Sequence, residues 1–127
     1  MNYLVDTQLL LWSSVETAKL SKQALAILED STSHLKFSVA SIWEIAIKRG
    51  LGRKDFLVEP QRIRRGLLRN GWNEIAISSE HAVATLNLPL LHKDPFDRLI
   101  LAQAHVEGYT LLTSDKIVAK YPGAVRV

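Results

Sequence analysis

Short apolar runs alternate along the chain with longer segments in which apolar residues recur every three or four positions. The short runs are typical of buried strands, and the longer segments are typical of amphipathic helices. The predicted strands cover residues 3–5, 35–38, 73–77, 110–113 and 124–127. The predicted helices cover residues 8–13, a segment capped by Ser21, 39–49, a segment between Pro60 and Gly71, 79–86, a segment from Pro95 to Gly108, and 115–120.

Strands that are separated by helices of this length predict a parallel sheet with helices on both of its faces. We therefore expect a three-layer α/β/α architecture around a central, mostly parallel sheet. The chain has 127 residues and a mass of 14.3 kDa, which is the size of one domain, so we assign residues 1–127 to a single domain. Its 47% hydrophobic and 23% charged residues exclude a disordered or low-complexity chain.

The same pattern predicts which large side chains are buried. Helix 39–49 carries four apolar residues that we assign to its buried side, namely Ile42, Trp43, Ala46 and Ile47. Trp12 also lies in an apolar helical pattern and is expected in the core, like Trp43. Trp72 follows Gly71 outside such a pattern, so it is the better candidate of the three tryptophans for an exposed contact.

The sequence contains no cysteine, which excludes disulfides, zinc–thiolate sites, iron–sulfur clusters and a cysteine nucleophile. No apolar run approaches the roughly 18–20 residues that span a bilayer, and Asp6 falls where a signal peptide would be apolar. We therefore expect a cytoplasmic protein that does not enter a membrane.

The net charge of +3 is unevenly distributed. The segment from Lys48 to Arg69 holds eight basic and two acidic residues, whereas the rest of the chain holds eight basic and eleven acidic ones. Such a basic segment suits a polyanionic partner, because each neutralised phosphate releases counterions. A solvated helix face would have the same composition, so charge alone leaves both interpretations open.

Four acidic residues stand where the carboxyl ends of parallel strands would gather them. Asp6 and Asp115 follow predicted strands, Asp97 lies in the first turn of the helix that Asp94 and Pro95 open, and Glu44 lies in an otherwise apolar helix. Each has a structural alternative. Asp6 and Asp115 could cap helices, Asp97 could favour the helix dipole, and Glu44 could pair with a lysine four residues later. Asp94 is an alternative to Asp97 for the chemical role, but we assign Asp94 to the N-cap of the helix because Pro95 follows it directly.

Carboxylates that converge without cysteine or paired histidine ligands favour a hard cation such as Mg²⁺ or Mn²⁺. Beside a basic segment, such an ion indicates phosphodiester chemistry, because it lowers the pKa of a bound water and stabilises charge on the phosphoryl group.

Four segments together resemble the PIN-domain proteins, and in particular the toxin ribonucleases of VapBC-type toxin–antitoxin pairs. They occur in the same order over nearly the whole chain, as Leu4–Trp12, Ser41–Lys48, Asp94–Ala104 and Leu111–Asp115. The family usually has histidine after the Asp-Thr pair, where this chain has Gln8. No catalytic step requires that histidine, so the expected activity is unchanged.

The resemblance implies a Mg²⁺- or Mn²⁺-dependent endoribonuclease that acts as the toxin of a toxin–antitoxin pair. Asp6 and Asp97 match the acids that would hold the metal most directly, and Glu44 and Asp115 match the two that would complete the site through water or a second ion. It further implies an RNA substrate, a homodimer and a small antitoxin that covers the active-site groove. Four further residues match positions that would bind substrate or, for the last two, neutralise the acids, namely Thr113, Ser114, Lys48 and Arg98.

Two other classes of function compete with this interpretation. A phosphatase or phospho-acceptor protein using Asp6 covalently would require a second acid two residues later, where Gln8 stands. A non-catalytic nucleic-acid or partner-binding module on the same fold would use the acids only as helix caps. The sequence contains no dinucleotide fingerprint, Walker motif or Gly-x-Ser-x-Gly elbow.

Overall fold

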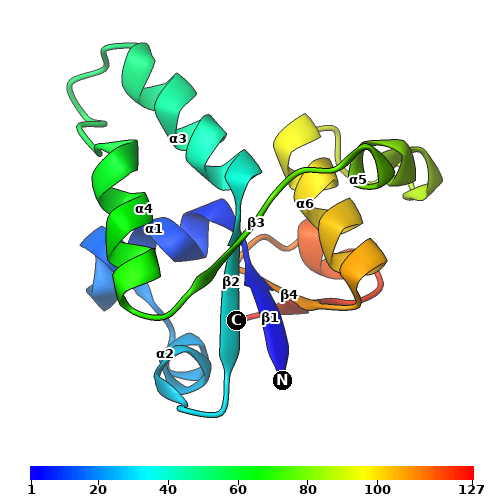
Figure 1. Cartoon of the computed structure of the whole chain (residues 1–127), viewed down its shortest axis with the longest axis horizontal. Coiled ribbons are helices and arrows are strands. Elements are labelled where there is room, and N and C mark those ends of the chain that lie inside the picture. The colour runs from blue at the N-terminus through cyan, green and yellow to red at the C-terminus, as the bar shows by residue number, and fades with distance from the viewer.

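The computed structural model describes all 127 residues and contains a five-stranded sheet in which every neighbouring pair of strands is parallel (Figure 1). The strand order is β3-β2-β1-β4-β5. The strands are β1 (Asn2–Val5), β2 (His34–Ser38), β3 (Asn73–Ile75), β4 (Thr110–Thr113) and β5 (Ala124–Arg126). The predicted parallel α/β/α architecture is confirmed.

Six α-helices flank the sheet. They are α1 (Thr7–Val15), α2 (Lys22–Glu29), α3 (Val39–Gly50), α4 (Pro60–Arg69), α5 (Ser79–Ala84) and α6 (Pro95–Glu107). The predicted helix 79–86 is shorter than expected, and the predicted helix 115–120 is reduced to a 3-10 turn at Val118–Lys120. Leu88 and Tyr121, which end these segments, are both extended because each precedes a proline. None of the helices combines the length and hydropathy needed to cross a bilayer.

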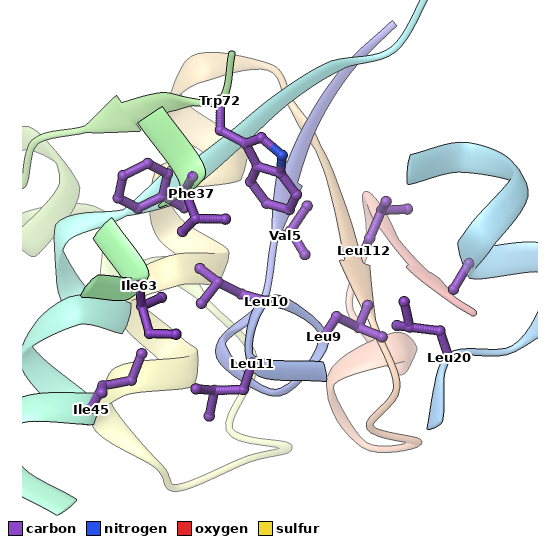
Figure 2. Close-up of a cluster of buried hydrophobic side chains, with 12 residues drawn as sticks. Val5, Leu9, Leu10, Leu11, Leu20, Phe37, Ile45, Ile63, Trp72 and Leu112 are labelled. Atoms are coloured by element: carbon purple, nitrogen blue, oxygen red, sulfur yellow. The ribbon is translucent and has the colours of Figure 1, made fainter. Parts of the chain in front are cut away.

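Successive strand residues point to opposite faces of the sheet and build a separate core on each face. On one face, Val5 and Leu112 pack with residues of α1, α2 and α4; Figure 2 shows Leu9 of α1 beside Leu20 in this core. On the other face, Leu4 and Leu111 pack against α6 and the C-terminal 3-10 turn. The sheet is therefore covered on both sides, and its carboxyl-terminal edge is left for the loops.

The chain reverses its direction of sheet growth between β1 and β4. After β1 it adds β2 and β3 on one side, then crosses to add β4 and β5 on the other. At such a reversal, two adjacent strands lead into helices that diverge from each other. Open α/β sheets bind ligands in the crevice that this leaves at the carboxyl ends of the two strands. Here the amide of Asp6 donates to the carbonyl of Leu112 at 3.0 Å, so the end of β1 is held beside the end of β4.

Three of the four burial predictions for α3 are wrong. Trp43 is 57% exposed, and Ala46 and Ile47 are also exposed, whereas Ser41 and Ile45 are fully buried. The reason is that α3 extends past the sheet edge and is covered only along one narrow side, with Trp43 meeting just the edge of the Phe96 ring (Figure 1).

Trp72, the tryptophan favoured for an exposed contact, is instead buried in the α4-side core. Gly71 adopts a φ of 86° and turns the chain back, and the Trp72 amide donates to the carbonyl of Leu67. The indole consequently lies near Val5 and Phe37 (Figure 2). Trp12 packs against the same core, as predicted.

Ser21 caps α2 as predicted, because its hydroxyl accepts from the amide of Ala24 at 3.0 Å. We expect Ser21→Ala to lower the free energy of unfolding by about 1 kcal/mol, since that amide loses its partner. Ser21→Asn keeps a hydrogen-bond acceptor at the cap, so this variant is expected to retain most of the wild-type stability. Urea denaturation measures both, and equal losses in the two variants would contradict the cap.

Candidate active site

A hollow of about 370 Å³ lies at the carboxyl ends of β1 and β4, and it contains all four predicted acids. It is lined by Asp6, Thr7, Gln8, Leu11, Glu44, Lys48, Asp97, Ser114 and Asp115. Only one of these nine side chains is hydrophobic. The fold therefore brings residues from positions 6 to 115 to one polar, acid-rich site.

Asp6 is the most deeply placed of the four acids, with 6% of its surface exposed. It caps α1, since one carboxylate oxygen accepts from the amide of Leu9 at 2.9 Å. Burial raises the pKa of Asp6 to about 6, although hydrogen bonds from Thr113 and Leu9 oppose the rise, and the charge of Asp97 adds to it. Asp6 can therefore act both as a helix cap and in the predicted chemical role, because its second carboxylate oxygen is not needed for the cap.

Glu44 reaches the hollow from α3, with its side chain 13% exposed. Its Oε2 atom pairs with Lys48 Nζ at 3.3 Å, one turn further along the helix, as the spacing allowed. Its Oε1 atom is buried and has no hydrogen-bond partner. A buried carboxylate oxygen without a partner is costly, so this atom is suited to a cation or an ordered water.

Asp97 lies in the first turn of α6, and its helix is capped by Asp94 as predicted. Asp94 accepts from the amides of Phe96 and Asp97. The ring Nε2 of His92 lies 2.7 Å from Asp97 Oδ2 and donates to it. Burial raises the pKa of Asp97, the hydrogen bond with His92 lowers it, and the charges of Asp94 and Glu44 raise it.

Asp115 stands at the rim, partly buried, and accepts from the amides of Ile117 and Val118. Its own amide donates to Thr113 Oγ1 at 3.0 Å. Thr113 is fully buried beneath the hollow and hydrogen-bonds to Asp6, whereas Ser114 lines the hollow directly. Thr113 therefore supports two of the acids from below, and Ser114 is the one that a substrate could reach.

Arg98 does not reach the hollow, which contradicts its predicted contact with substrate phosphates or with the acids. Its guanidinium donates to the carbonyls of Thr85, Pro89 and His92. It thus fastens the loop before α6 to the helix itself. Tyr121 assists, because its hydroxyl donates to the carbonyl of Pro89 and accepts from the amide of His92.

Much of the predicted basic segment is neutralised within the chain. Arg49 pairs with Glu59, Arg53 with Asp55, and Arg64 with Glu74. Four further basic side chains of this segment are exposed and form no ion pair, namely Lys54, Arg62, Arg65 and Arg69. The surface available to a polyanion is therefore smaller than the composition indicates.

The donor set fits a hydrated hard cation. It consists of carboxylate oxygens, one of them without a partner, and the pKa values of Asp6 and Asp97 are raised, chiefly by burial and further by the charges of neighbouring acids. No three of the four acids bring ligand atoms within 4.8 Å of one another; the group that does so is His92, Asp94 and Asp97. Mg²⁺ tolerates such spacing because it usually keeps several waters.

A larger hollow of about 760 Å³ lies between α2, α4 and the end of α1. Leucines and Trp72 form much of its wall, and its acids Glu29 and Asp30 are exposed. The pKa of Asp30 is lowered by hydrogen bonds from Thr32, as in an ordinary solvated turn. Size alone therefore does not locate the chemistry, which lies in the smaller, acid-lined hollow.

Four residues of the site were not among the predicted site residues. Thr7, Gln8 and Leu11 line the hollow from α1, and His92 holds Asp97. Helical spacing from Asp6 gives the position of Leu11, which carried no chemical signal of its own. His92 lies five residues before Asp97, and only the reversal of the loop brings them together.

Comparison with known proteins identifies the family of the fold. Residues 3–124 match the PIN domain family, and the chain belongs to that family. None of the curated proteins matches the chain in sequence.

Three solved structures have similar folds, and each contains a toxin–antitoxin or VapBC assembly. VapBC2 from Rickettsia felis, bound to a DNA fragment from its promoter, has a TM-score of 0.72 and 16% identity over 100% of this chain and 98% of that one. A toxin–antitoxin complex from Klebsiella pneumoniae has a TM-score of 0.66 and 26% identity over 97% and 95%. VapBC-1 from nontypeable Haemophilus influenzae has a TM-score of 0.54 and 16% identity over 91% and 87%. The predicted resemblance to VapBC-type PIN toxins is confirmed.

The buried Asp6 carboxyl predicts a pH-dependent stability. Folded Asp6 keeps its proton up to about pH 6, while the unfolded chain releases it near 3.8, so the folded state binds more protons between these values. The free energy of unfolding therefore falls as pH rises through this window. In EDTA, Asp6→Asn should gain stability relative to wild type by up to about 3 kcal/mol from about pH 4 to about pH 7.

Urea denaturation at several pH values measures this difference. The control is Asp30→Asn, because the pKa of Asp30 is lowered and its pH trend must have the opposite sign. A stability difference between Asp6→Asn and wild type that stays constant with pH would show that Asp6 does not titrate as described.

Proposed function

We propose that the protein is a Mg²⁺- or Mn²⁺-dependent endoribonuclease and the toxin of a type II toxin–antitoxin pair. The observation that carries this proposal is the gathering of Asp6, Glu44, Asp97 and Asp115 around one hollow of a PIN domain. One of these carboxylates has a buried oxygen without a partner. Helix caps alone would not require four acids to share a hollow.

The roles follow from burial and contacts. Asp6 and Asp97 hold the ion most directly, because Asp6 is buried, Asp97 is half-buried, and both have raised pKa values that a cation would lower. Glu44 offers its unpartnered Oε1, and Asp115 at the rim binds through water or a second ion. His92 fixes the orientation of Asp97 through its hydrogen bond.

When bound, the ion lowers the pKa of the attacking water and stabilises negative charge on the phosphoryl group. Ser114 lines the hollow and orients a substrate oxygen or water, and Thr113 holds Asp6 beneath it. Lys48 neutralises Glu44 in the free protein and contacts a phosphate in the complex. Because water is the nucleophile, the products carry 5′-phosphate and 3′-hydroxyl ends.

Partners are inferred from surface chemistry and from the similar structures. The exposed cations Lys54, Arg62, Arg65 and Arg69 supply attraction for cytoplasmic RNA. The exposed apolar side chains of Trp43, Ile47 and Leu90 favour a covered interface. The similar structures are toxin–antitoxin and VapBC assemblies, which supports a small antitoxin as a partner. We propose that this antitoxin covers the hollow and that the toxin forms a homodimer.

Cleavage of end-labelled structured RNAs tests the activity directly. Wild type should cleave with Mg²⁺ or Mn²⁺ and not with EDTA. Asp6→Asn and Asp97→Asn should each lose about 100-fold or more of the rate, because ion binding supplies several kcal/mol of transition-state stabilisation. Glu29→Gln changes an exposed acid outside the hollow and serves as the matched control.

The ends of the RNA products decide the chemistry. A 2′,3′-cyclic phosphate would contradict water as the nucleophile. Equal cleavage by wild type and the Asp variants would mean that other residues, or a contaminant, act. Binding of RNA without cleavage, unchanged by either substitution, would support the non-catalytic module instead.

Metal binding is also measurable without RNA. Saturating Mg²⁺ or Mn²⁺ should stabilise the folded protein by about 2.7 kcal/mol at a hundredfold excess over Kd, because the ion relieves repulsion between the acids. The melting temperature should therefore rise in wild type and in Glu29→Gln, and not in Asp97→Asn. An unchanged melting temperature of wild type would argue against the cation site.

A further inference from the structure

A buried hydrogen bond between two hydroxyl groups lies directly beneath the carboxylates. Thr7 Oγ1 donates to Ser41 Oγ at 2.9 Å across 34 residues of sequence. Thr7 is 5% exposed and Ser41 is fully buried. Thr7 directly follows Asp6, and Ser41 lies one helical turn before Glu44 on α3, so the bond joins the backbones that carry two of the acids.

A second buried link holds α3 to α6. Ser38 at the start of α3 donates to the side-chain oxygen of Gln103, whose amide nitrogen donates to the carbonyl of Ala76. Ser38 also accepts from the amide of Ala40, so this hydroxyl sets where α3 begins. The position of α3 relative to the helix of Asp97 is thereby fixed independently of Thr7. The Thr7–Ser41 hydrogen bond therefore has a separate role, which is to fix the position of α1 relative to α3.

Stability alone does not account for the Thr7–Ser41 pair. A buried hydrogen bond between neutral groups contributes little net stability, and apolar groups of the same shape would serve about as well. Apolar contacts, however, are non-directional and therefore define the relative position of α1 and α3 less sharply. Two hydroxyls, by contrast, bond only over a narrow range of distances and angles. Repulsion between the carboxylates acts to separate the same two elements.

We propose that Thr7 and Ser41 are positioning residues that hold Asp6 and Glu44 at the separation needed to share one divalent cation. This inference rests on the proposed function of the hollow. Ser41 carries the argument, because it is fully buried and does not line the hollow. Any effect of Ser41 on an ion or a substrate must pass through Thr7 and the two backbones.

Isothermal titration of Mn²⁺ into the full chain tests the proposal. Thr7→Val and Ser41→Ala should each weaken the Kd for Mn²⁺ by about tenfold, equivalent to about 1.4 kcal/mol. Thr7→Ser keeps the hydroxyl and should bind within about threefold of wild type. The Kd of the double variant Thr7→Val/Ser41→Ala should not exceed the higher of the two single-variant Kd values, because both substitutions remove the same hydrogen bond.

Ser13→Ala is the matched control, since Ser13 on α1 donates to the carbonyl of Leu10 within the same helix and joins no other element. Its Kd for Mn²⁺ should equal that of wild type. If Thr7→Val weakened binding and Ser41→Ala did not, Thr7 would be contacting the ion itself and the proposal would fail. Wild-type affinity in both variants would overturn it as well.

Crystal structures of the metal-free variants give a readout that needs no ion. The separation between the Asp6 and Glu44 carboxylates should be larger in Thr7→Val than in wild type and Thr7→Ser. An unchanged separation would overturn the inference. Absence of Mn²⁺ binding by wild type would overturn the proposed function instead, and these structures would still decide whether the hydroxyl pair sets the spacing.

Discussion

Mutual repulsion among carboxylates is the constraint around which this molecule is built. Four acids from positions far apart in the sequence border one hollow, and their charges oppose the folding that brings them together. The fold withstands this because two hydrophobic cores, one on each face of the parallel sheet, fix the strands independently of the site. Burial is the main cause of the raised pKa values of Asp6 and Asp97, and the charges of neighbouring acids add to the rise.

Polar contacts beneath the acids limit how the repulsion can be relieved. Thr113, Ser41 and Gln103 are all fully buried, and each bonds to an element that carries an acid. The acids are consequently unable to separate by small shifts of one helix. Protonation of Asp6 removes one of the charges below about pH 6, and the proposed cation would neutralise the site above that pH.

Signals within a few residues predicted the helices and strands. Packing between distant segments decided which of the remaining side chains are buried and which reach the site. The start signal of Asp94 with Pro95 and the short apolar runs of β1 and β4 act within a few positions, so the sequence predicted these elements. The four acids could be assembled because parallel strand ends meet at one edge. Trp43 and Arg98 were misassigned, and Trp72 was wrongly favoured for an exposed contact, because the surroundings of all three come from distant segments. His92 was missed because its partner Asp97 is reached through a loop whose course no periodicity indicates.

Arg98 ties the segment before α6 to that helix through three backbone carbonyls and does not use the side chains of the segment. The shape of the loop is therefore specified by main-chain atoms, which every residue type possesses. Leu86 and Leu90 on this loop are exposed and contribute nothing to its attachment. Mutations there can accumulate during evolution and alter what the outer surface recognises, while the helix of Asp97 keeps its place.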